Sequence, residues 1–393
     1  CPLFMISRKP SKVVTGKDGF ILDDLMSLTI KPMSELKMKY INMLRERSKD
    51  LLSACEYPDY IVSDVNLLRF VRGHMYDMDE TYDAFSKMLI WRKENNVNEY
   101  FKKVEEVGFD VHKVPYADVF ERVFHTSYHH KTDREGRIVD IRLLGSVDVK
   151  GLLARPLKEW IDYNIYILEW RIYTLNKMSE ETGILQRLNC IQDLKGVGMH
   201  MISPSLVTYL KEMTNVTSHN YPETMHRSFV INVPAIFTTL WAMAKPVMHP
   251  RTVKKVMICK GDYQEKLYAE IPIENLPTLL GGICRCPEGC LSYVKNQDEF
   301  VIPVSKQLTM PLDVKAGDKV AWHWKLESGD INNTITFESA EKKSTAVYSA
   351  KHIRNHESSF TATEDGRLFF FFDNSFSWVN GKKVIGMITV NEI

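Results

Sequence analysis

The stretch that most constrains the fold is residues 228–282. Two short runs rich in β-branched residues, 229–233 and 253–258, enclose one helix-length apolar segment. A strand, a helix and a second strand of these lengths predict a βαβ unit. The helix leaves almost no polar face apart from threonines and Lys245, and such a helix is either buried on all sides or covers something apolar. We therefore expect residues 234–249 to form a lid over a hydrophobic cavity.

The composition narrows the class of protein. At 393 residues the chain has room for two or three domains, each with its own core. The formal net charge is +1 with 26% charged residues, so no strong field favours nucleic acid or anionic lipid. We expect no nucleic-acid partner, and any contact with a membrane surface should be local and transient.

Cysteine usage and hydropathy indicate a location. The seven cysteines are an odd number without a spaced framework, which is typical of thiols in a reducing compartment. The sequence has no run of eighteen apolar residues, and residues 1–10 have too short an apolar core for a secretory signal. The expected location is cytoplasmic and peripheral to membranes.

Three patterns follow one another along the chain. Apolar residues recur every three or four positions from about 34 to 101, which predicts a helical bundle, with Ser63 and Asp77 as helix N-caps. From about 111 to 282, helices alternate with β-rich runs, as in a mostly parallel sheet covered by helices. From 297 to 393, short β-rich runs separated by turn signals predict an antiparallel sandwich.

The predicted elements and boundaries follow from these patterns. The fold class is multidomain: an N-terminal helical bundle, an α/β domain and a C-terminal all-β sandwich. Strands are expected at 137–144, 187–194, 300–304, 319–325, 334–338, 368–372 and 384–390, and helices at 157–178 and 206–214. The expected parts are an extension (1–32), a helical module (33–108), the α/β domain (109–283), a linker (284–296) and the sandwich (297–393).

Several long motifs, in order, resemble one family. Residues 63–94 resemble the N-terminal helical module of the CRAL-TRIO lipid-binding family, through the runs LLRF and WRK and an aromatic-Asp pair. Residues 133–282 resemble its lipid-binding domain, most clearly in NYPETMHRSFVINVPAIF. The tail resembles a GOLD domain, most clearly in FDNSFSWVNGKKV. The resemblance implies a carrier that encloses one hydrophobic ligand without cofactor or catalysis, with a lid that opens at a membrane and a possible protein partner for the GOLD domain.

The resemblance also implies pocket residues. Tyr163, Tyr166 and Trp170 recur at helical spacing, which is typical of either a core or a pocket lining. Leu188 and Cys190 stand two apart on one strand, where phosphatidylcholine-binding relatives carry hydroxyls. Two lost hydroxyls favour an apolar ligand such as a tocopherol, retinoid, carotenoid or squalene-like lipid. The other expected pocket residues are Val230, Phe237, Leu240, Trp241 and Ala244.

Residues that would hold a phosphorylated head group are only partly present. Phosphatidylinositol-binding relatives use a Glu-Arg pair, a Thr-x-x-Lys and a further Arg; this chain keeps Glu223, Thr252 and Lys255 but has Thr224 and His74 at the Arg positions. For Glu223 a structural salt bridge is the favoured interpretation. A phosphoinositide or phospholipid transfer or sensing protein stays the alternative, as does an adaptor that acts through its GOLD domain in membrane trafficking.

The remaining motifs do not predict a metal site or a catalytic site. Cys284, Cys286 and Cys290 have the spacing of part of a metal site, but a fourth ligand at usable spacing is missing and no histidine is near in sequence. We therefore expect loop thiols and no metal there. His352 and His356 lie in a β-rich region, where four-residue spacing does not favour chelation. No nucleophile elbow or phosphate-binding loop occurs, so we do not expect an enzyme.

Overall fold

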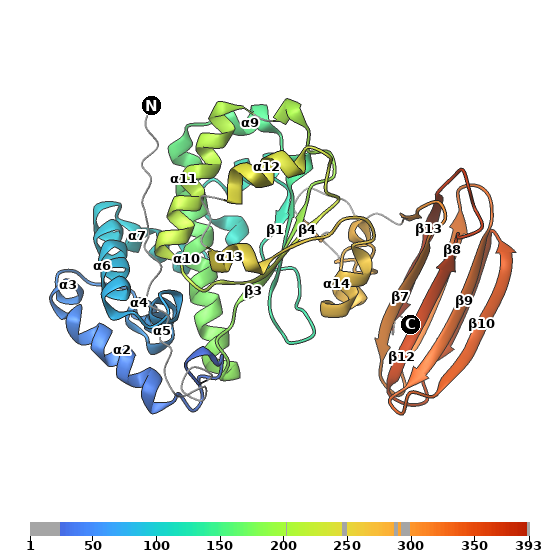
Figure 1. The fold of residues 1–393 in the computed structure, drawn as a ribbon, viewed down its shortest axis with the longest axis horizontal. Coiled ribbons are helices and arrows are strands. Elements are labelled where there is room, and N and C mark those ends of the chain that lie inside the picture. The colour runs from blue at the N-terminus through green and yellow to red at the C-terminus, as the bar shows by residue number, and fades with distance from the viewer. Residues whose placement is uncertain (1–23, 202, 246–249, 287–289, 292–298, 391–393) are drawn as a thin grey trace. The chain divides into compact units, whose positions relative to one another are not determined.

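The computed structural model describes residues 24–201, 203–245, 250–286, 290–291 and 299–390 (Figure 1). The chain divides into two compact units. One comprises the chain up to Asn98 together with Tyr173–Gln186, and the other comprises Glu99–Ile172 together with Arg187–Ile393. The domain boundaries expected from the sequence stay predictions, and the expected N-terminal extension falls largely outside the described residues.

The first unit is helical, as expected. Ser63 accepts a hydrogen bond from the backbone N–H of Asn66, and Asp77 accepts from those of Asp79 and Glu80, so both predicted N-caps are confirmed. Arg69, fully buried, donates to Asn176 at 2.7 Å, so this arginine of the family motif has a structural role. The helices are α2 (Glu35–Arg47), α3 (Lys49–Ser53), α4 (Asp59–Val62), α5 (Asp64–Gly73) and α6 (Met78–Glu94), and α7 (Val97–Glu106) follows them.

The second unit contains a sheet in the order β1-β2-β3-β4-β5. The pairs from β2 to β5 are parallel, and β1 lies antiparallel to β2 at the edge. The predicted mostly parallel sheet is thus confirmed. The strands are β1 (Thr126–Ser127), β2 (Val139–Leu143), β3 (Leu188–Asp193), β4 (Met225–Ile231) and β5 (Val256–Ile258).

Helices cover both faces of this sheet. Figure 1 shows α10 and α11 on one side and α14 on the other. Pro156 precedes α10, and Gly183, at φ +72°, follows its last residue, so a rigid start and a left-handed stop bound this long helix. The helices are α8 (Ala117–Val123), α9 (Val149–Leu153), α10 (Leu157–Thr182), α11 (Pro204–Asn220), α12 (Phe237–Ala244), α13 (Pro250–Lys255) and α14 (Gln264–Glu270), with short 3₁₀ turns at Val111–Lys113, Leu144–Ser146, Met199–Met201, Ile273–Asn275 and Thr278–Leu280.

The predicted strand at 253–258 is partly wrong. Its first three residues belong to α13, and β5 begins only at Val256. The helical turn brings Lys255 back to the start of β4, where its ammonium group donates to the carbonyl of Met225 at 2.8 Å. A tertiary contact therefore overrides the β propensity of this short run.

The C-terminal region is an all-β sandwich, as expected, and it is consistent with a GOLD domain. Two four-stranded sheets have the orders β10-β9-β12-β7 and β11-β8-β13-β6. The sequence prediction missed β7, β10 and β11, and the last two are exposed edge strands without the alternation of buried residues that marks β9. The strands are β6 (Glu299–Ile302), β7 (Gln307–Val314), β8 (Lys319–Leu326), β9 (Ile331–Ser339), β10 (Ser344–Ile353), β11 (Asn355–Thr361), β12 (Gly366–Asp373) and β13 (Lys382–Val390).

Among the described residues, every helix is too short or too polar to cross a bilayer.

Candidate functional site

The two faces of the α/β sheet differ in chemistry. Side chains of Val139, Ile141, Ile191 and Phe229 form an apolar core on the face toward α14. The opposite face carries residues that pair across the parallel strands and therefore point the same way. One row across β2–β5 is Asp140, Cys190, Ser228 and Val256, and the next is Arg142, Gln192, Val230 and Ile258.

A charged cluster occupies this second face. The Asp140 carboxylate, fully buried, accepts hydrogen bonds from Arg142 at 2.8 Å and from Arg171 of α10 at 2.6 Å. Burial lowers the pKa of Arg171, although Asp140 opposes that shift. The Nε atom of Arg171 is buried without a hydrogen-bond partner in this structure, so one guanidinium donor remains for a further acceptor.

The expected pocket role of Leu188 and Cys190 stays a prediction, but the surroundings of Cys190 are more polar than an apolar floor requires. Both side chains are buried, at 4% exposure each, but Cys190 stands between Asp140 and Ser228 across the strands. Burial raises the pKa of the Cys190 thiol to about 11, so it is a neutral side chain. Gln192, two residues further on, donates to the Ser228 hydroxyl at 2.9 Å. Strand periodicity placed Cys190 on this face correctly but could not show which residues of β2 and α10 lie beside it.

The aromatic residues of α10 lie in a hydrophobic cluster. Tyr163 is fully buried, stacks on Phe120 with ring centroids 5.2 Å apart, and shares a hydrogen bond of 3.1 Å with Tyr128. Trp170 belongs to the same cluster, and Tyr166 packs against its edge. The guanidinium of Arg171 lies over the Tyr128 ring at 5.9 Å, which joins this cluster to the charged face of the sheet. A role of these aromatic residues in lining a pocket stays a prediction.

The lid predicted at 234–249 contains the helix α12. Phe237 and Trp241 are half-buried and stack with ring centroids 6.0 Å apart. The side chains of Leu240 and Ala244 lie outside what the structure describes, as do residues 246–249. A lid role for α12 stays a prediction, as does ligand contact by Val230, which is buried in β4.

Three cationic side chains converge on Glu223. Its carboxylate lies 3.2 Å from Arg251, 3.5 Å from Lys255 and 3.6 Å from Arg187. The side chain is 5% exposed, and the backbone has φ +54°, a conformation that costs about 1–3 kcal/mol outside glycine and is found at functional sites. This geometry agrees with the salt-bridge interpretation.

The other head-group candidates lie close by on α13. Burial lowers the pKa of Lys255, which Glu223 partly opposes. Thr252 is half-buried one turn before Lys255. His74, which stands where relatives have an arginine, ends α5 and contacts the carbonyl of Phe70 through Nδ1 at 2.9 Å.

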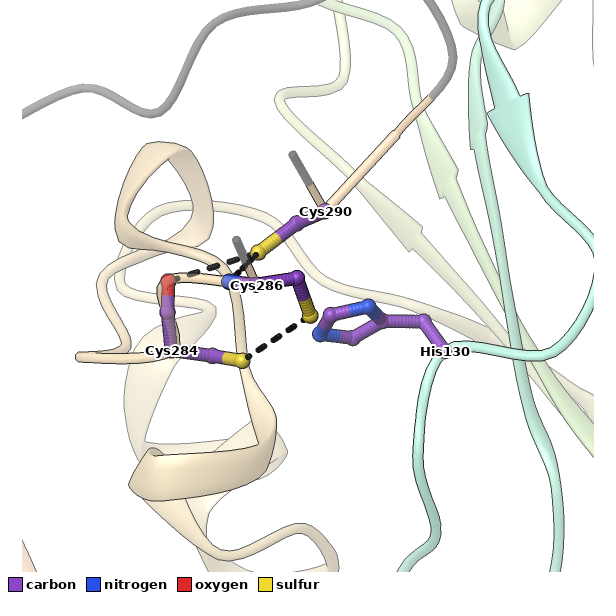
Figure 2. Close-up of side chains that lie close together, drawn as sticks. All are labelled: His130, Cys284, Cys286 and Cys290. Carbon is purple, nitrogen blue, oxygen red and sulfur yellow. Dashed lines mark hydrogen bonds between the residues drawn. The ribbon is translucent and has the colours of Figure 1, made fainter. Parts of the chain in front are cut away.

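A second cluster, which the sequence analysis dismissed, has the donor set of a metal site. Three cysteine sulfurs and one imidazole nitrogen all lie within 4.8 Å of one another. Figure 2 shows the His130 ring pointing toward the sulfurs. No fourth ligand stands near the three cysteines in the sequence, but the fold supplies His130 from the segment between β1 and β2. The members of this Cys₃His cluster are His130, Cys284, Cys286 and Cys290.

The fold defines a class: an α/β domain with a mostly parallel sheet and a long helix, α10, that is rich in aromatic residues. Comparison with known proteins agrees with this class. A CRAL/TRIO domain model matches residues 125–282. The Sec14 cytosolic factor of Schizosaccharomyces pombe is 33% identical over 235 residues, covering 58% of this chain and 78% of the relative.

Two further relatives are similar. The SEC14 cytosolic factor of Kluyveromyces lactis is 32% identical over 241 residues, covering 60% of this chain and 75% of the relative. The Arabidopsis thaliana protein named phosphatidylinositol/phosphatidylcholine transfer protein SFH12 is 29% identical over 243 residues, covering 58% of this chain and 42% of the relative. The chain belongs to the CRAL-TRIO family and is similar to Sec14 cytosolic factors.

Proposed function

We propose that this protein binds one phospholipid, with phosphatidylinositol or phosphatidylcholine as the ligand class, and exchanges it between membranes. The observation that carries the proposal is the charged sheet face at Asp140, inside the domain that the CRAL/TRIO model matches. The names of the relatives support the same ligand class. The proposed activity is binding and exchange, not catalysis.

The polar sheet face supports a phospholipid over an isoprenoid. Ester and phosphate oxygens need donors when they leave water, and a buried polar group left unpaired costs about 1–3 kcal/mol. The Arg171 Nε atom is a buried donor without a partner, and Gln192 and Ser228 add further polar atoms to this face. An isoprenoid would leave these groups unused.

The cluster at Glu223 supports a phosphate contact. Three cations around one carboxylate carry an excess of positive charge, and Arg and Lys bind phosphate through charge-assisted hydrogen bonds. Thr252 and Lys255 lie on α13 beside this charge. We propose that this cluster contacts a phosphorylated head group, while Glu223 itself keeps the cations in place.

The isoprenoid carrier remains a second candidate, because Leu188 and Cys190 lack the hydroxyls of phosphatidylcholine binders. The test is competition between labelled phosphatidylcholine, phosphatidylinositol and α-tocopherol for the full chain. Preference for tocopherol over both phospholipids would reject the main proposal. Under that outcome, the double variant Leu188→Ser with Cys190→Thr should shift the preference toward phosphatidylcholine.

Transfer of phosphatidylinositol between vesicles tests the head-group contact. Replacing both Arg251 and Lys255 by alanine should reduce this transfer about tenfold, since a phosphate contact to a partly buried cation contributes about 1.5–3 kcal/mol. The matched control is Lys254→Ala, an exposed neighbour on the same helix. Equal transfer by both variants would exclude the head-group role.

A cytosolic location and a peripheral contact with membranes are part of the proposal. The relatives from S. pombe and K. lactis are named cytosolic factors, which supports the location. A protein partner for the sandwich stays a prediction from the resemblance to GOLD domains.

A further inference from the structure

The Cys₃His cluster shares no residue with the groups proposed to bind lipid. His130 lies in the segment between β1 and β2, and its backbone N–H donates to the carbonyl of Val139 at 2.8 Å. Cys284 pairs with Pro277 in a short parallel bridge at the end of the α/β domain. Cys290 follows shortly afterwards and is buried. The fold thus joins two segments about 150 residues apart in the chain, a separation at which a cross-link restricts the unfolded chain strongly.

His130 supplies an independent sign of a missing ligand. It is only 3% exposed, and its Nε2 atom has no hydrogen-bond partner in this structure. Leaving a buried polar nitrogen unpaired costs about 1–3 kcal/mol. The imidazole points toward the sulfur atoms (Figure 2), which is the orientation that a ligating histidine needs.

The sulfur geometry fits one metal ion. The Sγ atoms of Cys284 and Cys286 are 3.7 Å apart, and a tetrahedral zinc ion with Zn–S bonds of about 2.3 Å separates its sulfurs by about 3.8 Å. A disulfide needs about 2.05 Å instead. The Cys290 sulfur lies 3.5 Å from the backbone nitrogen of Cys286 and 3.4 Å from the carbonyl oxygen of Cys284, so the third cysteine is in direct contact with the other two. All four donor atoms lie within 4.8 Å of one another, and a tetrahedral site needs separations of about 3.5–3.8 Å.

We propose that the Cys₃His cluster binds a single zinc ion as a closed structural site. Thiolate and imidazole ligands in tetrahedral geometry select zinc among the common biological metals. Four protein ligands leave no open position for a substrate, so the role is structural. Zinc uptake converts three thiols to thiolates and releases their protons to solvent, without a change of oxidation state. The proposal does not depend on the identity of the lipid.

The zinc ion fixes the segment that leads out of the α/β domain. It ties this segment to the loop between β1 and β2. Three thiolates and one zinc ion carry a net charge of −1, and the positively charged Lys131 is next to His130 in the chain. Binding of the metal to the folded chain alone adds directly to stability.

Metal analysis of the full-length protein tests the proposal. Protein purified under reducing conditions, without a metal-affinity tag, should contain about one zinc ion per chain by elemental analysis and native mass spectrometry. Cys284→Ser and His130→Gln should each lower the zinc content to background. Matched controls are Cys259→Ser, a buried cysteine outside the cluster, and His129→Gln, the exposed neighbour of His130; both should keep the ion.

Cobalt substitution keeps the test independent of variant folding. Apo wild-type chain titrated with Co²⁺ should show the visible bands of a tetrahedral ion and thiolate-to-cobalt charge-transfer bands, saturating at about one equivalent. Chelation of zinc should lower the thermal midpoint of the wild type but not that of Cys284→Ser. A wild type that takes up neither zinc nor cobalt, that contains iron instead, or that has a disulfide within the cluster would overturn the proposal.

Discussion

The buried carboxylate of Asp140 accepts hydrogen bonds from two guanidinium groups. This one residue therefore balances the positive charge of both arginines at the candidate site. Arg142 stands two residues further along the same strand, while Arg171 comes from α10. Removing the carboxylate leaves two cations close together, one of them buried. Loss of the carboxylate destabilises the folded protein, because nothing then offsets the desolvation of the buried guanidinium charge.

Asp140→Asn should therefore lower the free energy of unfolding by about 3 kcal/mol, because breaking a buried ion pair from one side typically costs about 3–5 kcal/mol and the amide keeps one acceptor. The measurement is urea denaturation. The matched control is Asp83→Asn, which removes an exposed ion pair with Lys87 and should change stability by less than about 1 kcal/mol. Similar changes in both variants would show that the buried cluster does not stabilise the fold.

The titration of His226 should make the stability of the protein depend on pH. Burial, with Arg137, Arg187 and Arg227 nearby, lowers its pKa to about 4, and Arg187 donates to its Nδ1 atom at 3.2 Å. In the unfolded chain the same imidazole has its ordinary pKa of about 6.5. Between pH 6.5 and 4 the unfolded state therefore binds more protons than the folded state. The stability contributed by the neutral ring is complete above pH 6.5 and is lost as the pH falls toward 4.

His226→Gln keeps an acceptor for Arg187 but cannot titrate. Near pH 4.5 the wild type should therefore lose about 1 kcal/mol more stability than the variant, after allowance for the partial exposure of the ring. Thermal unfolding of both proteins between pH 4.5 and 7.5 measures this difference. Parallel pH profiles would contradict the assignment of a neutral His226.

At the scale of elements, α12 stands out because its sequence, FTTLWAMA, is apolar apart from two threonines. Its aromatic residues Phe237 and Trp241 stack on each other and remain half-buried. Moving a Trp or Phe side chain from water into an apolar environment contributes about 1.5–3 kcal/mol. A membrane interface offers such an environment when the helix meets it.

Phe237→Asp with Trp241→Asp should abolish lipid transfer between vesicles and leave a folded protein, because the charges prevent insertion of α12. The matched control is Thr238→Asp with Ala242→Asp, which places the same charges at the same spacing on exposed positions of the helix. Transfer should continue in the control. Transfer at the original rate by the aromatic variant would show that α12 is not the membrane-contact element.

At the scale of the whole molecule, the Cys₃His cluster determines where the sandwich can be removed. A sandwich of this size usually carries its own core, so lipid binding should not require it. A chain that ends at Gly282 loses all three cysteine ligands, whereas a chain that ends at Leu291 keeps them. The two truncations differ in the proposed zinc site and in the backbone pairing of Ile283 and Cys284 with Ile273 and Leu276, and removal of the metal separates the two effects.

The chain ending at Leu291 should retain bound lipid, measured by extraction and mass spectrometry, and should unfold cooperatively at a higher temperature than the chain ending at Gly282. Removing zinc with a chelator should abolish the zinc-dependent part of this difference in midpoint. Loss of lipid from a cooperatively folded Leu291 chain would mean that the sandwich is needed to close the binding site.

Local patterns in the sequence determined the elements. The 3.6-residue and two-residue periods predicted the helices of the first unit and most strands, and hydroxyl and carboxylate side chains at Ser63 and Asp77 predicted helix starts, because these signals act within a few residues. Edge strands such as β10 and β11 escaped prediction, since they do not bury one face.

Only the tertiary structure decided which side chains from distant segments lie beside one another. Strand periodicity placed Cys190 on a face, but the parallel register and the packing of α10 put Asp140 and Arg171 beside it. Cysteine spacing alone left a metal site incomplete, and chain topology supplied His130 from about 150 residues away. Contacts between distant segments depend on register and packing, which no local pattern records.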